Sequence, residues 1–221
     1  MKRLLLIVEG ETEENFVNDV LRPYFSTMGI YNSVQCFKTK HSNGGLSKYS
    51  YIKKDILNTI YEKDVIVSTM IDFYRLPSDF PGFNKLQESQ THQEQVSILE
   101  AEIKIDIENM QKRKFDNFIP YIQLHEFEAL VFSSVKGFDS LFERNEIDYQ
   151  GIVEVIQDFP NPEDINNHPN TAPSMRLKKL IPGYNKVVYG IEIIKAVGMT
   201  EILKTCPRFS MWIEIIKAAL A

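Results

Sequence analysis

The chain has 221 residues, of which 43% are hydrophobic and 25% are charged, a composition typical of a globular protein with a substantial core. Its net charge of -5 argues against a protein that coats nucleic acid by bulk electrostatics. No apolar run approaches the roughly 18 residues that a transmembrane helix needs, and the amino terminus lacks a signal-peptide cleavage site. We therefore expect a cytoplasmic protein with no membrane partner.

The first half of the sequence alternates between strand and helix patterns. Strands are predicted at residues 3–8, 33–38, 65–71 and 118–124, and those at 3–8 and 65–71 are expected to be buried. Helical spacing of apolar residues lies between them, at 12–22, 52–60 and 96–110, and a loop is predicted through 42–45. Thr12 is predicted to cap the first helix, and Pro23 to end it, because proline lacks a backbone donor. This alternation predicts a parallel sheet covered by helices.

Beyond residue 133 the pattern becomes mostly helical. Pro173 is suited to the first position of a helix, and short helices are predicted near 186–197, 199–205 and 208–220. We expect an α/β core over 1–132 and a helical extension over 133–221 that packs on it as one compact domain. Cys36 and Cys206 lie too far apart for a CxxC metal site and are expected to be reduced and structural.

Acidic residues follow three of the predicted strands. Glu9 follows the first, Asp72 the third, and both Glu126 and Glu128 the fourth, while Glu13 lies one turn into the first helix. Carboxyl ends of parallel strands meet at one edge of a sheet, where ligands bind. Carboxylates gathered there repel one another unless cations or protons neutralise them, and Mg²⁺ and Mn²⁺ prefer oxygen ligands. The expected chemistry is phosphoryl transfer with a metal-activated water.

Each acidic residue also has a structural interpretation. Glu13 suits the dipole of a helix amino terminus, Glu128 could face solvent, and Asp72 could cap a turn. The basic residues add a second signal, because residues 171–221 hold eight Lys or Arg against three Glu, a charge of +5, which leaves -10 for the rest. This asymmetry suits a phosphate-facing wall beside an acidic edge, and an ordinary solvated surface is the alternative.

The segment from Val8 to Glu13 resembles the EGxTE signature of Toprim domains, most closely those of OLD-like nucleases. Asp72 matches the first aspartate of the family's second motif, and His125–Leu130 resembles the later acidic segment of the OLD-like branch. The whole chain looks like an uncharacterised bacterial domain-of-unknown-function family within that branch. One departure is Tyr74, which stands where Toprim domains commonly have a second aspartate, so that Asp79 or Glu126 would have to substitute.

The resemblance implies a Toprim-like (Rossmann-like) fold and an Mg²⁺- or Mn²⁺-dependent nuclease that acts on DNA or RNA. It also implies a role in phage defence with a separately encoded ATPase as partner. Glu9, Glu13, Asp72, Glu126 and Glu128 are the expected metal ligands. OLD-like nucleases bring a late basic residue to the scissile phosphate, and the nearest candidate is Lys186, with Ser174 and Arg176 as further phosphate contacts at a helix start. The expected catalytic set is therefore Glu9, Asp72, Glu126 and Lys186.

Other site classes do not fit the sequence. It contains no GxxxxGK[ST] segment, and its four histidines lack zinc-ligand spacing. The alternative to a nuclease is a catalytically weak Toprim-like module that binds an ATPase partner or nucleic acid. The missing second aspartate and the acidic body favour this alternative, and the residues point to no particular oligomer.

Overall fold

A parallel sheet forms the centre of the protein. The structure, a computed structural model, describes residues 2–30, 34–39, 46–74, 76–165 and 168–221, so Ser33 and the predicted loop 42–45 lie outside it. The sheet has the order β2-β1-β3-β4, and β5 continues beside β3. Its strands are β1 (Arg3–Val8), β2 (Val34–Lys38), β3 (Val65–Asp72), β4 (Phe118–Ile119) and β5 (Ile122–Gln123). The predicted α/β class is confirmed.

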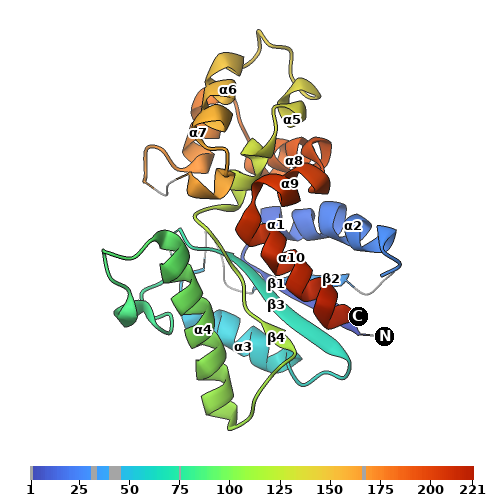
Figure 1. Cartoon of the computed structure of the whole chain (residues 1–221), viewed down its shortest axis with the longest axis vertical. Coiled ribbons are helices and arrows are strands. Elements are labelled where there is room, and N and C mark those ends of the chain that lie inside the picture. The colour runs from blue at the N-terminus through green and yellow to red at the C-terminus, as the bar shows by residue number, and fades with distance from the viewer. Residues whose placement is uncertain (1, 31–33, 40–45, 75, 166–167) are drawn as a thin grey trace.

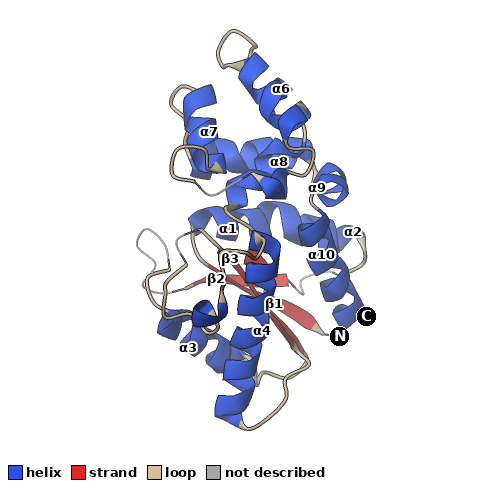
Figure 2. Cartoon of the chain, turned by 60° about the vertical axis from the view of Figure 1, so that its left-hand side comes forward, coloured by secondary structure: helices blue, strands red, loops and turns tan. Residues whose placement is uncertain are grey.

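Helices cover both faces of the sheet (Figures 1 and 2). Alternate residues of β1 point to opposite faces. Leu5 and Ile7 pack in one core with α3 (Tyr49–Thr59) and α4 (His92–Gln111). Leu4, Leu6 and Val8 pack in another core with the first helix and the carboxyl-terminal helices. No helix in the described residues is long and apolar enough to cross a membrane.

The first helix differs from its prediction at both ends. It begins as α1 (Glu11–Phe16) with Gly10 as N-cap, so Thr12 lies inside the helix. It then continues through the π-helical η1 (Val17–Leu21) into α2 (Arg22–Thr27), past the predicted stop at Pro23. The π-helical segment shifts the hydrogen-bonding pattern just before the proline. The missing N–H therefore falls in the first turn of a new α-helical segment, where it costs little.

The predicted strand 118–124 is broken into β4 and β5, because Pro120 cannot donate a ladder hydrogen bond. The side chain of Thr69 bridges the break. Its Oγ1 accepts a hydrogen bond from the Tyr121 N–H (2.9 Å) and donates one to the Tyr121 carbonyl (2.8 Å). The chain therefore stays beside β3 and delivers residues 124–128 to the carboxyl edge of the sheet.

The carboxyl-terminal portion is helical, as predicted, and α7 begins at Pro173. A short helical turn, η2 (Phe83–Lys85), lies between β3 and α4. The elements of the carboxyl-terminal portion are η3 (Phe127–Ser133), α5 (Lys136–Asp139), α6 (Tyr149–Asp158), η4 (Pro162–Asp164), α7 (Pro173–Leu180), η5 (Lys186–Gly190), α8 (Ile191–Val197), α9 (Met199–Thr205) and α10 (Pro207–Leu220).

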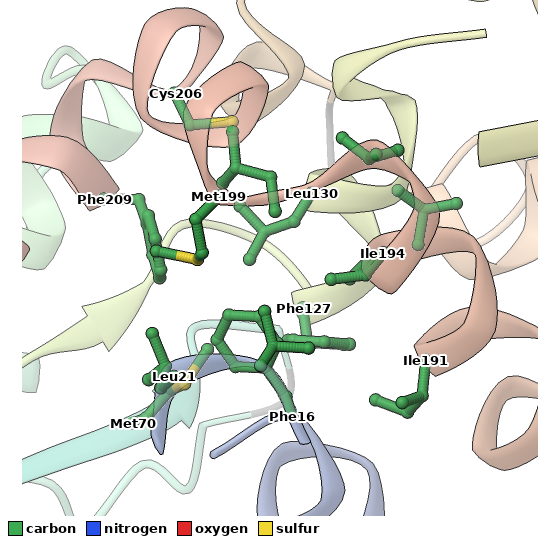
Figure 3. Close-up of a cluster of buried hydrophobic side chains, with 14 of the residues drawn as sticks. Phe16, Leu21, Met70, Phe127, Leu130, Ile191, Ile194, Met199, Cys206 and Phe209 are labelled. Carbon is green, nitrogen blue, oxygen red and sulfur yellow. The ribbon is translucent and has the colours of Figure 1, made fainter. Parts of the chain in front are cut away.

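One core joins this portion to the sheet. Phe16 of α1 contacts Phe127 of η3 and Phe209 of α10, with ring centroids 5.0 and 6.0 Å apart (Figure 3). Cys206 is buried in the same core, and both cysteines are free. Because α1 packs against elements from the end of the chain, residues late in the sequence can reach the carboxyl edge of the sheet. The predicted division at residue 132 stays a prediction.

Candidate functional site

The ends of β1 and β3 bring two predicted site residues together. The strands pair in parallel with Val8 opposite Met70, so Glu9 and Asp72 follow at the same edge. Glu9 accepts hydrogen bonds from two backbone N–H groups, those of Leu46 (3.0 Å) and Asp72 (3.2 Å). Oδ1 of Asp72 accepts one from the Phe127 N–H (2.9 Å). Backbone donors therefore hold both carboxylates in place.

Glu13 joins this edge from α1, where the residue is buried at 3% exposure. Gly10 leaves the space for it. A Cβ added at Gly10 would lie 2.8 Å from Oε2 of Glu13, and a contact that short forces the carboxylate to move. Gly10 has extended backbone angles (φ -139°) that any residue adopts, so its importance lies in the absence of a side chain and not in backbone freedom.

The substitution Gly10→Ala tests this packing. We expect it to lower the free energy of unfolding by about 1 kcal/mol, because the added methyl group displaces the buried Glu13 carboxylate. In a Glu13→Ala background the methyl group meets no carboxylate, and we expect Gly10→Ala to cost clearly less. Urea unfolding of the four proteins measures the coupling. If Gly10→Ala lowers the free energy of unfolding equally in both backgrounds, Glu13 is not held against Gly10.

Glu128 completes the group from η3, after a left-handed turn at His125 (φ 65°) redirects the chain. The residue is buried at 2% exposure, and its Oε1 accepts no hydrogen bond within the described part of the chain. The Lys186 ammonium lies 3.7 Å from this oxygen. Lys186 is the first residue of η5, which packs beside α1 and α8.

We call Glu9, Glu13, Asp72 and Glu128 the acidic cluster. Burial raises the pKa of each member, and the field of other members raises it further. The pKa of Asp72 lies well above its usual value, and that of Glu128 is raised to about 7. Burial opposes the charge of Lys186, yet the four carboxylates together raise its pKa. One lysine cannot neutralise four carboxylates, so the site favours protons or a further cation.

The other predicted site residues contact different groups. Glu126 is turned to the start of α7, where its carboxylate accepts hydrogen bonds from the N–H (2.9 Å) and hydroxyl (3.0 Å) of Ser174. Arg176 donates from Nε to the Thr171 carbonyl (2.8 Å), and its guanidinium lies over the Phe159 ring. Ser174 and the Nε of Arg176 thus bind groups within the protein.

The basic carboxyl-terminal segment is largely paired within the fold. Three of its lysines pair with glutamates three residues earlier on the same helices: Lys195, Lys204 and Lys217. Arg208 pairs with Glu100, 2.5 Å away. Half of the eight basic residues are therefore matched by carboxylates outside the acidic cluster. Among the residues predicted to contact phosphate, Lys186 is the one beside the acidic edge.

The donor chemistry of the acidic cluster fits a hard divalent cation. Within the described ranges, no three Asp, Glu, His or Cys side chains form a ready-made metal-binding group. Mg²⁺ is usually held by one or two carboxylates and several waters, so it does not need three protein ligands. Asp79, a predicted substitute for the second aspartate, instead accepts hydrogen bonds from the Tyr49 N–H at the start of α3. Oxygen donors and unmatched negative charge are the features that suit Mg²⁺ or Mn²⁺.

Two neighbours of the site were not predicted from the sequence. The Tyr184 hydroxyl is buried without a hydrogen-bond partner in the described residues, and burial, with the nearby Glu128 and Glu126, raises its pKa. The Leu46 N–H, which holds Glu9, comes from the loop before α3. No local pattern marks either group, because each reaches the site from a segment remote in sequence.

Comparison with known proteins places the chain in a family without adding an activity. No curated protein and no solved structure shows significant similarity to it. The family described as Domain of unknown function (DUF4276) matches residues 8–217, which include every member of the acidic cluster and Lys186. Because the match spans nearly the whole sequence, the chain belongs to the DUF4276 family.

Proposed function

We propose that this protein is a metal-dependent nuclease of Toprim type that cleaves phosphodiester bonds. The observation that carries the proposal is the acidic cluster: four carboxylates, one just after β1 and the others in α1, β3 and η3, interact electrostatically with Lys186 at the carboxyl edge of a parallel sheet. This edge is where α/β proteins bind ligands. A site that combines excess carboxylate with one ammonium suits a divalent cation and a phosphate together.

The residues have distinct roles in this proposal. Glu9 and Asp72 would hold Mg²⁺ or Mn²⁺, and backbone N–H groups keep both carboxylates oriented. Glu128 would complete the binding of the cation through Oε1, and Glu13 would accept hydrogen bonds from the waters around it. A bound divalent cation supplies Lewis acidity, and it lowers the pKa of a coordinated water. Lys186 would offset the charge that develops on the phosphate, and Glu126 orients the start of α7 through Ser174.

The resemblance of Glu9–Glu13 and Asp72 to Toprim motifs supports the same reaction class. OLD-like nucleases act with ATPases, so we also propose a separately encoded ATPase as partner and a role in bacterial defence against phage. These two parts of the proposal rest on the resemblance alone. The cleavage reaction rests on the site as well, and it can be tested on the isolated protein.

The direct test is a cleavage assay with the purified protein. Supercoiled plasmid DNA, single-stranded DNA and RNA are incubated with Mg²⁺, with Mn²⁺ and with EDTA. We expect cleavage of at least one substrate with a divalent cation and none with EDTA. Inactivity on all three substrates with either divalent cation would contradict the nuclease.

The alternative is a catalytically weak module that binds an ATPase or nucleic acid. Two observations favour it: Tyr74 stands in place of a second aspartate, and no three potential ligands form a ready-made group in the described residues. Mn²⁺ distinguishes the two functions, because a ligand that binds only the folded protein raises its melting temperature. Mn²⁺ should raise the melting temperature of a protein with a nuclease site, whereas it should change that of a protein with a relic site little.

A further inference from the structure

Lys186 is placed to act on the acidic cluster as a whole. Its ammonium lies 3.7 Å from Oε1 of Glu128, a buried oxygen that accepts no hydrogen bond within the described residues. Its charge also lowers the pKa of Glu9, Glu13 and Asp72. The lysine thus supplies positive charge at the position where a divalent cation would supply it.

The Lys186 ammonium and a divalent cation repel each other when both occupy the site. A Mg²⁺ or Mn²⁺ ion bound to Oε1 of Glu128 at about 2.1 Å would lie within about 6 Å of the ammonium nitrogen. At that separation, beside a buried carboxylate, the repulsion between the two cations is only partly screened. Binding of the divalent cation therefore favours a position of the ammonium farther from Glu128.

The lysine side chain is able to leave. It is 51% exposed, whereas the Glu128 side chain is 3% exposed, so the ammonium reaches the cluster from the solvent side. The carboxylates are fixed by backbone hydrogen bonds and burial, but the described contacts of the ammonium are electrostatic. A flexible four-carbon side chain can swing to solvent without a backbone change.

We propose that Lys186 is a resident counter-cation that competes with divalent cations for the acidic cluster. In the metal-free protein its ammonium neutralises part of the carboxylate charge, and this lowers the affinity for Mg²⁺ or Mn²⁺. A phosphate group entering the site offers the ammonium another anion and thereby relieves the competition. This inference rests on the proposed metal-binding function and adds a means by which substrate and metal binding are coupled.

Calorimetric titration with Mn²⁺ alone tests the competition. We expect Lys186→Met to tighten Mn²⁺ binding by about tenfold, because it removes a positive charge from the site and keeps the length of the side chain. Lys186→Arg keeps the charge and should stay within about twofold of the parent. Lys178→Met removes an exposed lysine of α7 and is the control for net charge.

The outcomes separate the two proposals. Equal or weaker Mn²⁺ binding by Lys186→Met, with the parent protein binding Mn²⁺, would overturn the competition and leave the metal site standing. No Mn²⁺ binding by any of the proteins would overturn both. Lys186→Gln provides a second neutral variant, and circular dichroism of each protein checks that the fold is kept. Tighter binding by both neutral variants, with the Arg variant and the control unchanged, supports the counter-cation.

Discussion

Replacing Asp72 by Asn is expected to abolish both the proposed Mn²⁺-dependent stabilisation and the proposed nuclease activity. Oδ1 of Asp72 accepts a hydrogen bond from the Phe127 N–H, and the Asn carbonyl can keep that bond while the negative charge is lost. Mn²⁺ at a hundred times its Kd stabilises a folded protein by about 2.7 kcal/mol, and we expect that increment to vanish. Loss of the metal should reduce cleavage by about 10³-fold or more.

The metal-free Asp72→Asn protein should be as stable as the parent or more stable. Burial and the charges of Glu13, Glu9 and Glu128 all oppose ionisation of Asp72, so a neutral side chain relieves repulsion. Differential scanning calorimetry with and without Mn²⁺ measures both effects. A strongly destabilised metal-free variant would show that Asp72 serves the fold, and an unchanged response to Mn²⁺ would remove it from the metal site.

Glu9→Gln provides a comparison in which a lost hydrogen bond offsets the relief of charge repulsion. Both Glu9 oxygens accept backbone hydrogen bonds, but a Gln amide group can accept through only one of its two polar atoms. One backbone N–H then loses its partner, at a cost of about 1–3 kcal/mol that offsets the relief of repulsion. We therefore expect Glu9→Gln to lose the response to Mn²⁺ as Asp72→Asn does, but to gain less stability without metal.

The metal-free protein is expected to lose stability as the pH rises from about 5 to 8, and Glu128 is expected to cause much of that loss. Burial raises the pKa of Glu128 to about 7 from a usual 4.5, so between these values the folded protein holds a proton that the unfolded chain has released. The free energy of unfolding therefore falls as the pH rises through this window and levels off above it. A shift of this size corresponds to about 3 kcal/mol.

Urea unfolding of the parent and of Glu128→Gln at pH 5 and pH 8, without divalent cations, measures this contribution. The variant carries a neutral side chain of the same shape, so its stability should fall by about 3 kcal/mol less than that of the parent. Groups outside the acidic cluster titrate alike in both proteins and cancel in the comparison, and saturating Mn²⁺ should restore stability to the parent at pH 8. An equal pH dependence in the two proteins would show that Glu128 is ionised throughout.

The fold could be predicted from the sequence where the signal is local. The apolar runs of β1 and β3 and the helical spacing of α3 and α4 mark elements whose burial pattern repeats along the chain. Predictions were wrong where one element depends on another. The break between β4 and β5 is stabilised by Thr69 of the neighbouring strand, and the helix passes Pro23 because of the preceding π-helical segment.

The sequence by itself determined that Glu9 and Asp72 lie at one edge, because each directly follows a buried strand of the same parallel sheet. Only the tertiary structure decided which of Glu126 and Glu128 joins the acidic cluster. Residues two apart in a strand share a face, but Glu126 ends the extended segment and Glu128 lies in η3, so Glu126 faces Ser174 and Glu128 faces Lys186. Likewise, charge alone could not separate Lys186 from Arg176, since the packing of η5 beside α1 brings Lys186 to the acidic cluster.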